Sequence, residues 1–144
     1  MLVEKCRELD IPTASYEALK AGADYVGPDG NVVKNELVTE EGPKSLKYAY
    51  CADTLFTDSY MDIIKGADTI YHECTYLEAD AEKAFHRFHS TAGQAAQIAQ
   101  MAGCNQLLLG HFSSKYKELE KFEEEAREIF VNSQIAVEGF TYDI

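Results

Sequence analysis

The chain has 144 residues, of which 46% are hydrophobic and 26% are charged, a balance that suits one folded domain and excludes a disordered chain. The formal net charge of −12 excludes a generally basic nucleic-acid-binding surface, because phosphate binding relies on Lys and Arg, although a local basic patch is compatible with it. No apolar run is long enough to cross a membrane, and the first residues mix both charges instead of forming a signal-like apolar stretch. We therefore expect a cytoplasmic protein with a single domain over residues 1–144.

The N-terminal part of the sequence predicts short helices and a hairpin. Pro12 disfavours continuation of the first helix, and Ser15 is a candidate cap for the second. Gly-Pro-Asp-Gly at 27–30 is a strong signal for a tight turn between two strands. The expected elements are a helix over 2–9, a short helix over 15–19, strands over 23–26 and 31–33, and a further extended stretch over 35–38.

The rest of the chain repeats a pattern of a strand, a polar tip and a helix. The expected strands cover 46–51, 69–72 and 106–109, the helices that follow them cover 59–65, 78–85 and 118–130, and a last strand covers 134–137. Between the second and third of these units, Ser90 or Thr91 is expected to cap an alanine-rich helix over 94–101 that ends at Gly103. This alternation predicts an α/β fold whose functional residues gather at the carboxyl ends of the strands.

Two polar residues, Asp53 and His111, follow predicted buried strands directly. A carboxylate and an imidazole at strand ends are the oxygen and nitrogen donors that a metal-assisted hydrolase needs. Each residue also has a purely structural interpretation, Asp53 as a cap of the next turn and His111 as a hydrogen-bonded structural histidine. Spacing alone leaves both interpretations open.

A second pair, Glu73 and His89, points to proton transfer. His89 precedes Ser90 and Thr91 at the start of a helix, where free amides and the helix dipole favour an anion such as phosphate. His89 could then protonate a leaving oxygen, and Glu73 could orient that histidine or tune its proton affinity. The alternatives are an ordinary Ser/Thr cap beside an unrelated histidine, and a carboxylate bonded to nearby backbone amides.

Other catalytic arrangements have weaker support in the sequence. There is no Gly-x-Ser-x-Gly elbow for a Ser/His/Asp hydrolase, and no P-loop or Gly-x-Gly-x-x-Gly for a nucleotide cofactor. Cys51 or Cys74 could act as a nucleophile with His72 or His89, although buried thiols in strands are usually inert.

The motifs in their order are more specific than any one of them. They are Tyr-Ala-Tyr-Cys-Ala-Asp-Thr (48–54), His-Glu-Cys-Thr (72–75), His-Ser-Thr-Ala-Gly-Gln (89–94), Leu-Leu-Leu-Gly-His-Phe-Ser-Ser-Lys-Tyr (107–116) and Glu-Ala-Arg-Glu-Ile-Phe-Val-Asn (125–132). This set resembles the ribonuclease Z family, the tRNA 3′-processing endonucleases of the metallo-β-lactamase superfamily. The resemblance covers essentially the whole chain and is strongest from 48 to 132.

The resemblance implies the fold and the chemistry. The fold would be the C-terminal half of a metallo-β-lactamase αββα sandwich, and the complete enzyme would be a homodimer that binds two zinc ions and removes the 3′ trailer from precursor tRNA. Asp53 would bridge the zinc ions, His111 would be a terminal ligand, and His89, helped by Glu73, would donate a proton to the leaving group. The residues expected to contact substrate are Ser90, Thr91, Ser113 and Lys115.

The chain also departs from the family's pattern. Cys74 replaces an alanine, and Lys115 replaces a frequent arginine, so a phosphate contact there would be a point charge and not a bidentate fork. The family's His-x-His-x-Asp-His motif, a further histidine ligand and the tRNA-gripping arm are absent. We therefore expect the chain alone to be inactive on tRNA and to bind zinc weakly. The alternatives are another phosphodiesterase of the superfamily and a non-catalytic remnant that serves as a folding or dimerisation module.

Overall fold

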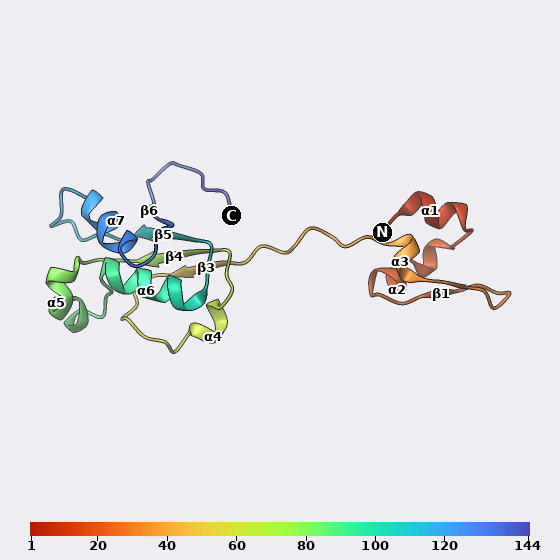
Figure 1. Cartoon of the computed structure of the whole chain (residues 1–144), viewed down its shortest axis with the longest axis horizontal. Coiled ribbons are helices and arrows are strands. Elements are labelled where there is room, and N and C mark those ends of the chain that lie inside the picture. Colours follow the sequence, from red (N-terminus) through yellow and green to blue (C-terminus); the bar gives the residue numbers. More distant parts are fainter. The chain divides into compact units, whose positions relative to one another are not determined.

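The structure is a computed structural model that describes all residues, 1–144. The chain forms two compact units, Met1–Lys44 and Ser45–Ile144 (Figure 1). The single domain expected over residues 1–144 stays a prediction. No helix in the structure is both long and apolar enough to span a membrane.

The N-terminal unit is a small α/β cluster around four buried side chains. Its elements are α1 (Val3–Glu8), the 3-10 turn η1 (Thr13–Ser15), α2 (Tyr16–Lys20), β1 (Tyr25–Val26), β2 (Val32–Val33) and α3 (Asn35–Val38). β1 and β2 pair antiparallel, which confirms the predicted hairpin. The buried core of the unit consists of Cys6, Ile11, Leu19 and Val38.

Two expectations for this unit are wrong in detail. Residues 35–38 form the helix α3 and not an extended stretch, because Asn35 is held at its start: its backbone N–H donates to Asp24 Oδ1 (2.8 Å) and its side-chain amide donates to the Leu19 carbonyl (2.7 Å). Ser15 precedes α2, but its side chain makes no capping hydrogen bond. The turn η1 positions the start of α2 instead, with the Ser15 N–H donating to the Pro12 carbonyl.

The second unit is built on a four-stranded parallel sheet whose strands lie in chain order. The strands are β3 (Tyr48–Cys51), β4 (Thr69–Glu73), β5 (Gln106–Gly110) and β6 (Ser133–Ile135). The connecting elements are α4 (Met61–Ile64), the 3-10 turn η2 (Glu78–Asp80), α5 (Ala81–His86), α6 (Ala92–Ala102) and α7 (Glu120–Arg127). Every predicted strand and helix of this unit is therefore present, with β3, α4, α7 and β6 shorter than expected and β4, β5 and α6 longer, and the α/β fold is confirmed.

Helix α6 is the central connection of the sheet and lies alongside it in Figure 1. Thr91 caps it: its hydroxyl accepts from the Gln94 N–H, and the Gln94 side chain accepts from the Thr91 N–H. This reciprocal capping box selects Thr91 over Ser90, and Gly103 ends the helix with a left-handed φ of 66°. The small residues of α6 are buried against β4 and β5, which fixes the position of the helix start beside the sheet edge.

The two faces of the sheet differ in how well they are covered. Ala49, Ile70 and Leu107 are aligned across β3, β4 and β5 and belong to the core shared with α6. On the alternate positions, Tyr50 and Tyr71 stack with ring centroids 4.6 Å apart. Tyr50 is 66% exposed, so this face of β3 is an open aromatic surface.

Candidate active site

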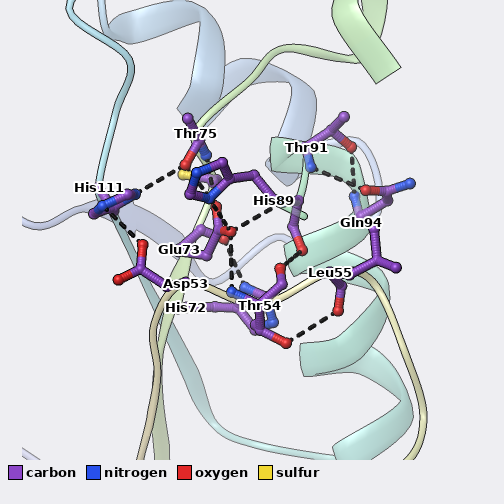
Figure 2. A network of polar contacts seen from close by, with 12 residues as sticks. Asp53, Thr54, Leu55, His72, Glu73, Thr75, His89, Thr91, Gln94 and His111 are labelled. Atoms are coloured by element: carbon purple, nitrogen blue, oxygen red, sulfur yellow. Dashed lines mark hydrogen bonds and ion pairs between the residues drawn. The ribbon is translucent and has the colours of Figure 1, made fainter. Parts of the chain in front are cut away.

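The parallel register brings three of the predicted site residues to one edge of the sheet. Cys51 is aligned with His72, and Glu73 with Gly110, so the strand ends of β3, β4 and β5 lie next to one another. Asp53, Glu73 and His111 sit at or just beyond those ends, and His89 joins them from the turn before α6 (Figure 2).

Glu73 is the best satisfied polar group of the site. Its side chain is fully buried and accepts five hydrogen bonds. On Oε1 the donors are Thr54 N–H (3.2 Å), Ser90 N–H (3.1 Å) and His89 Nδ1 (2.9 Å), and on Oε2 they are Thr75 N–H (2.9 Å) and Thr75 Oγ1 (2.9 Å). Because only donors face the carboxylate, the network joins β4, the loop after β3 and the start of α6 around an acceptor-only group.

His89 is held by this carboxylate in one orientation. Its Nδ1 lies 2.9 Å from Glu73 Oε1, and its side chain is 22% exposed. With Nδ1–H donating to Glu73, Nε2 is left to exchange a proton with a substrate. Glu73 and His89 therefore form the geometric pair that the proton-transfer hypothesis requires.

Asp53 and His111 form a second and more open pair. Asp53 Oδ1 lies 3.0 Å from His111 Nε2, with side chains that are 70% and 44% exposed. Both residues have positive φ, 49° for Asp53 and 60° for His111. A left-handed backbone is uncommon for residues other than glycine and concentrates at functional sites. The two carboxyl-end turns therefore hold strained conformations that aim these side chains at each other.

Gly110 leaves room for a neighbouring aromatic ring. A Cβ on Gly110 would lie 2.1 Å from the Tyr71 hydroxyl oxygen. The residue is therefore a glycine because the Tyr71 ring occupies the space, while the sharp turn itself falls on His111.

The donor set at the edge fits a zinc ion in part. Asp53, His89 and His111 each offer a ligand atom, all within 4.8 Å of one another. Oxygen and imidazole nitrogen are zinc donors, and two ligands of one tetrahedral zinc lie about 3.3 Å apart, close to the spacing of the Asp53–His111 pair. The set suits part of one zinc site and is too small for two ions.

The four residues expected to contact substrate differ in how free they are. Ser90 and Thr91 are buried, and their hydroxyls donate to the Thr54 carbonyl (2.7 Å) and to Glu78 Oε2 (2.7 Å). Lys115 forms an ion pair with Asp80. Ser113 lines a cavity of about 630 Å³ that His111 also borders. The substrate-contacting role of all four stays a prediction.

The alternative cysteine nucleophiles have no activating environment. Burial raises the pKa of the Cys51 thiol, and it raises the pKa of the Cys74 thiol well above its ordinary value. A thiol of raised pKa is a poor source of thiolate, so the surroundings of Cys51 and Cys74 do not support a cysteine nucleophile.

Comparison with known proteins gives close relatives for nearly the whole chain. It is 40% identical to ribonuclease Z of Porphyromonas gingivalis over 151 aligned residues, which cover 98% of this chain and 50% of that protein. It is also 40% identical to ribonuclease Z of Parabacteroides distasonis over 134 residues, which cover 93% of this chain and 44% of that protein. This chain is a homologue of ribonuclease Z. It spans about half the length of the curated relatives that it matches.

Solved structures place this ribonuclease Z homologue in the metallo-β-lactamase fold. The Bacillus subtilis metallo-β-lactamase fold protein YhfI matches with a TM-score of 0.60 and 27% identity, over 65% of this chain and 38% of that one. A long-form RNase Z from yeast matches with a TM-score of 0.54 and 24% identity, over 60% of this chain and 12% of that one, and supports the fold alone. No family model matches the chain.

Sequence reasoning missed Thr75 at the site of this ribonuclease Z homologue and considered His72 only as a partner of a cysteine nucleophile. Thr75 contacts both Glu73 and His111, and its place two residues after Glu73 was the available signal. His72 is fully buried, with Nδ1 2.6 Å from the Glu73 carbonyl oxygen and Nε2 2.9 Å from the Tyr60 hydroxyl. Desolvation lowers the pKa of His72, so it stays neutral and supports the end of β4.

Proposed function

We propose that this chain carries the proton-transfer half, and part of the metal-binding half, of the active site of a zinc-dependent endoribonuclease that removes the 3′ trailer from precursor tRNA. The observation that carries the proposal is the juxtaposition of two pairs at one sheet edge, Glu73–His89 at 2.9 Å and Asp53–His111 at 3.0 Å. A general acid next to a metal-binding pair is the combination that phosphodiester hydrolysis requires.

His89 is the proposed general acid. Glu73 accepts a hydrogen bond from Nδ1–H of His89 and stabilises the positive charge that the ring carries when both nitrogens are protonated. Nε2 then gives its proton to the leaving 3′ oxygen of the tRNA, so that this oxygen departs as a hydroxyl. Because Glu73 is locked by four further donated bonds, the ring is held ready before substrate binds.

Asp53 and His111 are the proposed metal ligands. Zinc held there would activate water and offset charge on the phosphate oxygens. Three nearby donors cannot hold two ions, so the remaining ligands of a two-zinc site have to come from outside these 144 residues. The homodimer and the cytoplasmic location expected from the sequence stay predictions.

The leaving group gives the sharpest test of the His89 role. In a full-length ribonuclease Z that contains this sequence, His89→Gln is expected to lower the rate of precursor tRNA cleavage by about 10²–10⁴-fold. Hydrolysis of bis(p-nitrophenyl) phosphate should fall far less, because p-nitrophenolate leaves without a proton. The matched control is His86→Gln, since the His86 side chain is exposed on α5, where it faces Glu82.

Equal losses on both substrates would contradict a general acid at His89. Unimpaired hydrolysis of the chromogenic diester with no precursor tRNA cleavage by the unmodified protein would favour the other phosphodiesterase function. No hydrolysis of either substrate would favour the non-catalytic module.

The chain by itself provides a further prediction. We expect no precursor tRNA cleavage by the purified 144-residue chain with added zinc, and weak zinc affinity in calorimetry, because the donors at the edge are too few. Robust cleavage by this chain would overturn the assignment of half a site.

A further inference from the structure

Thr75 lies between the two pairs of the site. Its Oγ1 is 2.9 Å from Glu73 Oε2 and 2.9 Å from His111 Nδ1, and the residue is 6% exposed (Figure 2). It is the side chain that contacts the carboxylate of one pair and the imidazole of the other. A buried hydroxyl with two polar neighbours has to divide one proton and its lone pairs between them.

The Thr75 hydroxyl can favourably donate its hydrogen bond only to Glu73. Glu73 only accepts, so a Thr75 hydroxyl turned toward His111 would face Oε2 with a lone pair at 2.9 Å in a buried environment. When the Thr75 hydroxyl donates its hydrogen bond to Glu73, its oxygen can interact favourably with His111 only by accepting a hydrogen bond from Nδ1–H. His111 Nδ1 therefore carries a hydrogen.

We propose that Thr75 is a positioning residue that sets the tautomer of His111 and ties this histidine to the Glu73–His89 pair. In the neutral ring, a proton on Nδ1 leaves the lone pair on Nε2, the atom that lies 3.0 Å from Asp53 Oδ1. Asp53 favours the other tautomer, because its carboxylate could accept a hydrogen bond from a protonated Nε2. Its 70% exposure lets water satisfy the carboxylate, whereas the Thr75–Glu73 contact is buried and has no such substitute.

The inference rests on the proposed function for its purpose, because a histidine binds a metal ion through an unprotonated ring nitrogen, and this tautomer leaves Nε2, on the side of Asp53, unprotonated. The tautomer itself is a property of the metal-free chain. One hydroxyl thus orients the ligand histidine with the same buried carboxylate that orients the acid histidine.

The test is the protonation of the His111 ring nitrogens, read from long-range ¹H–¹⁵N spectra of the metal-free chain at about pH 8.5, where an ordinary histidine is neutral. The wild-type chain should show protonated Nδ1 and unprotonated Nε2. Thr75→Val removes the acceptor at similar volume and should move the proton to Nε2, facing Asp53. Thr75→Ser restores the hydroxyl and should restore the wild-type pattern, which loss of packing alone would not do.

Two results would overturn the proposal: an unprotonated Nδ1 in the wild-type chain, or an unchanged Nδ1 proton in Thr75→Val. Backbone amide spectra check that each variant is folded, and the wild-type spectrum decides the matter even if Thr75→Val does not fold. Because the measurement needs neither metal nor RNA, its failure is separate from a failure of the cleavage assays.

Discussion

The two pairs at the sheet edge are opposites in their surroundings. In the first pair, Glu73 is fully buried and His89 is partly buried, and the carboxylate accepts hydrogen bonds from five donors on four residues. Asp53 and His111 form an exposed pair on strained turns, with Thr75 as the further hydrogen-bond partner of the imidazole. Both residues of the proposed proton-transfer pair lie within this chain, whereas the proposed metal-binding pair and His89 together offer only three donors.

The contrast shows that neighbouring elements of one small sheet can satisfy a buried carboxylate but do not supply enough ligands for a two-metal site. A buried carboxylate is stable when neighbouring amides and hydroxyls satisfy it, and the loop after β3, the end of β4 and the turn before α6 supply those donors to Glu73. A two-metal site needs more ligands than the three donors at this edge provide. Substitutions at the two pairs should therefore act in contrasting ways, the first on stability and the second on metal binding.

The strongest expected contrast is between Glu73→Gln and Asp53→Asn. Glu73→Gln turns one acceptor oxygen into an NH₂ group that faces donors, and should lower the free energy of unfolding by about 3 kcal/mol. Asp53→Asn is the control, with an expected change within about 0.5 kcal/mol because the side chain is largely exposed. Urea unfolding of both variants of this chain measures the difference, and equal effects would erase the contrast between the pairs.

Gly110→Ala probes the turn that carries His111. The added Cβ would overlap the Tyr71 ring, and the resulting displacement should cost about 1–3 kcal/mol. Gly42→Ala is the matched control, because a Cβ at Gly42 meets no atom within 4 Å. The midpoints of thermal unfolding give the comparison. A harmless Gly110→Ala would mean that Tyr71 moves aside easily and does not hold the turn.

The smallest effect concerns the support behind Glu73. Burial lowers the pKa of His72 in the folded chain, so below an ordinary histidine pKa of about 6.5 the unfolded state binds a proton that the folded state resists. Stability should therefore fall as the pH drops from 7 toward 5. His72→Gln should flatten this dependence in urea unfolding at successive pH values, and His86→Gln, at an exposed position, should leave it unchanged. An identical slope in the His72 variant would show that His72 does not titrate with unfolding.

Sequence predicted the second unit well because its signals are local. Apolar runs marked each strand, and Ser90 or Thr91 and Gly103 marked the two ends of α6, where the structure selects Thr91 as the cap. The fold class and the common edge of Asp53, Glu73 and His111 followed from the pattern of strands with polar tips, and the pairing of Glu73 with His89 followed from the position of His89 at the start of a helix. Three details could not be predicted from local sequence. They are the helix α3, set by contacts from Asn35 to distant backbone atoms, the left-handed φ of Asp53 and His111, and the position of Thr75 between Glu73 and His111. Each depends on which atoms meet in space, and residue type does not encode that.

The stacked Tyr50 and Tyr71 rings provide an intrinsic spectroscopic probe of this face of the sheet. The sequence contains no tryptophan, so tyrosines dominate its near-ultraviolet absorption and emission. This pair lies on β3 and β4, the strands that lead to Asp53 and Glu73, and Tyr50 faces solvent. Any molecule that covers this face will change the polarity around one ring of a coupled pair, and near-ultraviolet circular dichroism will register that event without a label.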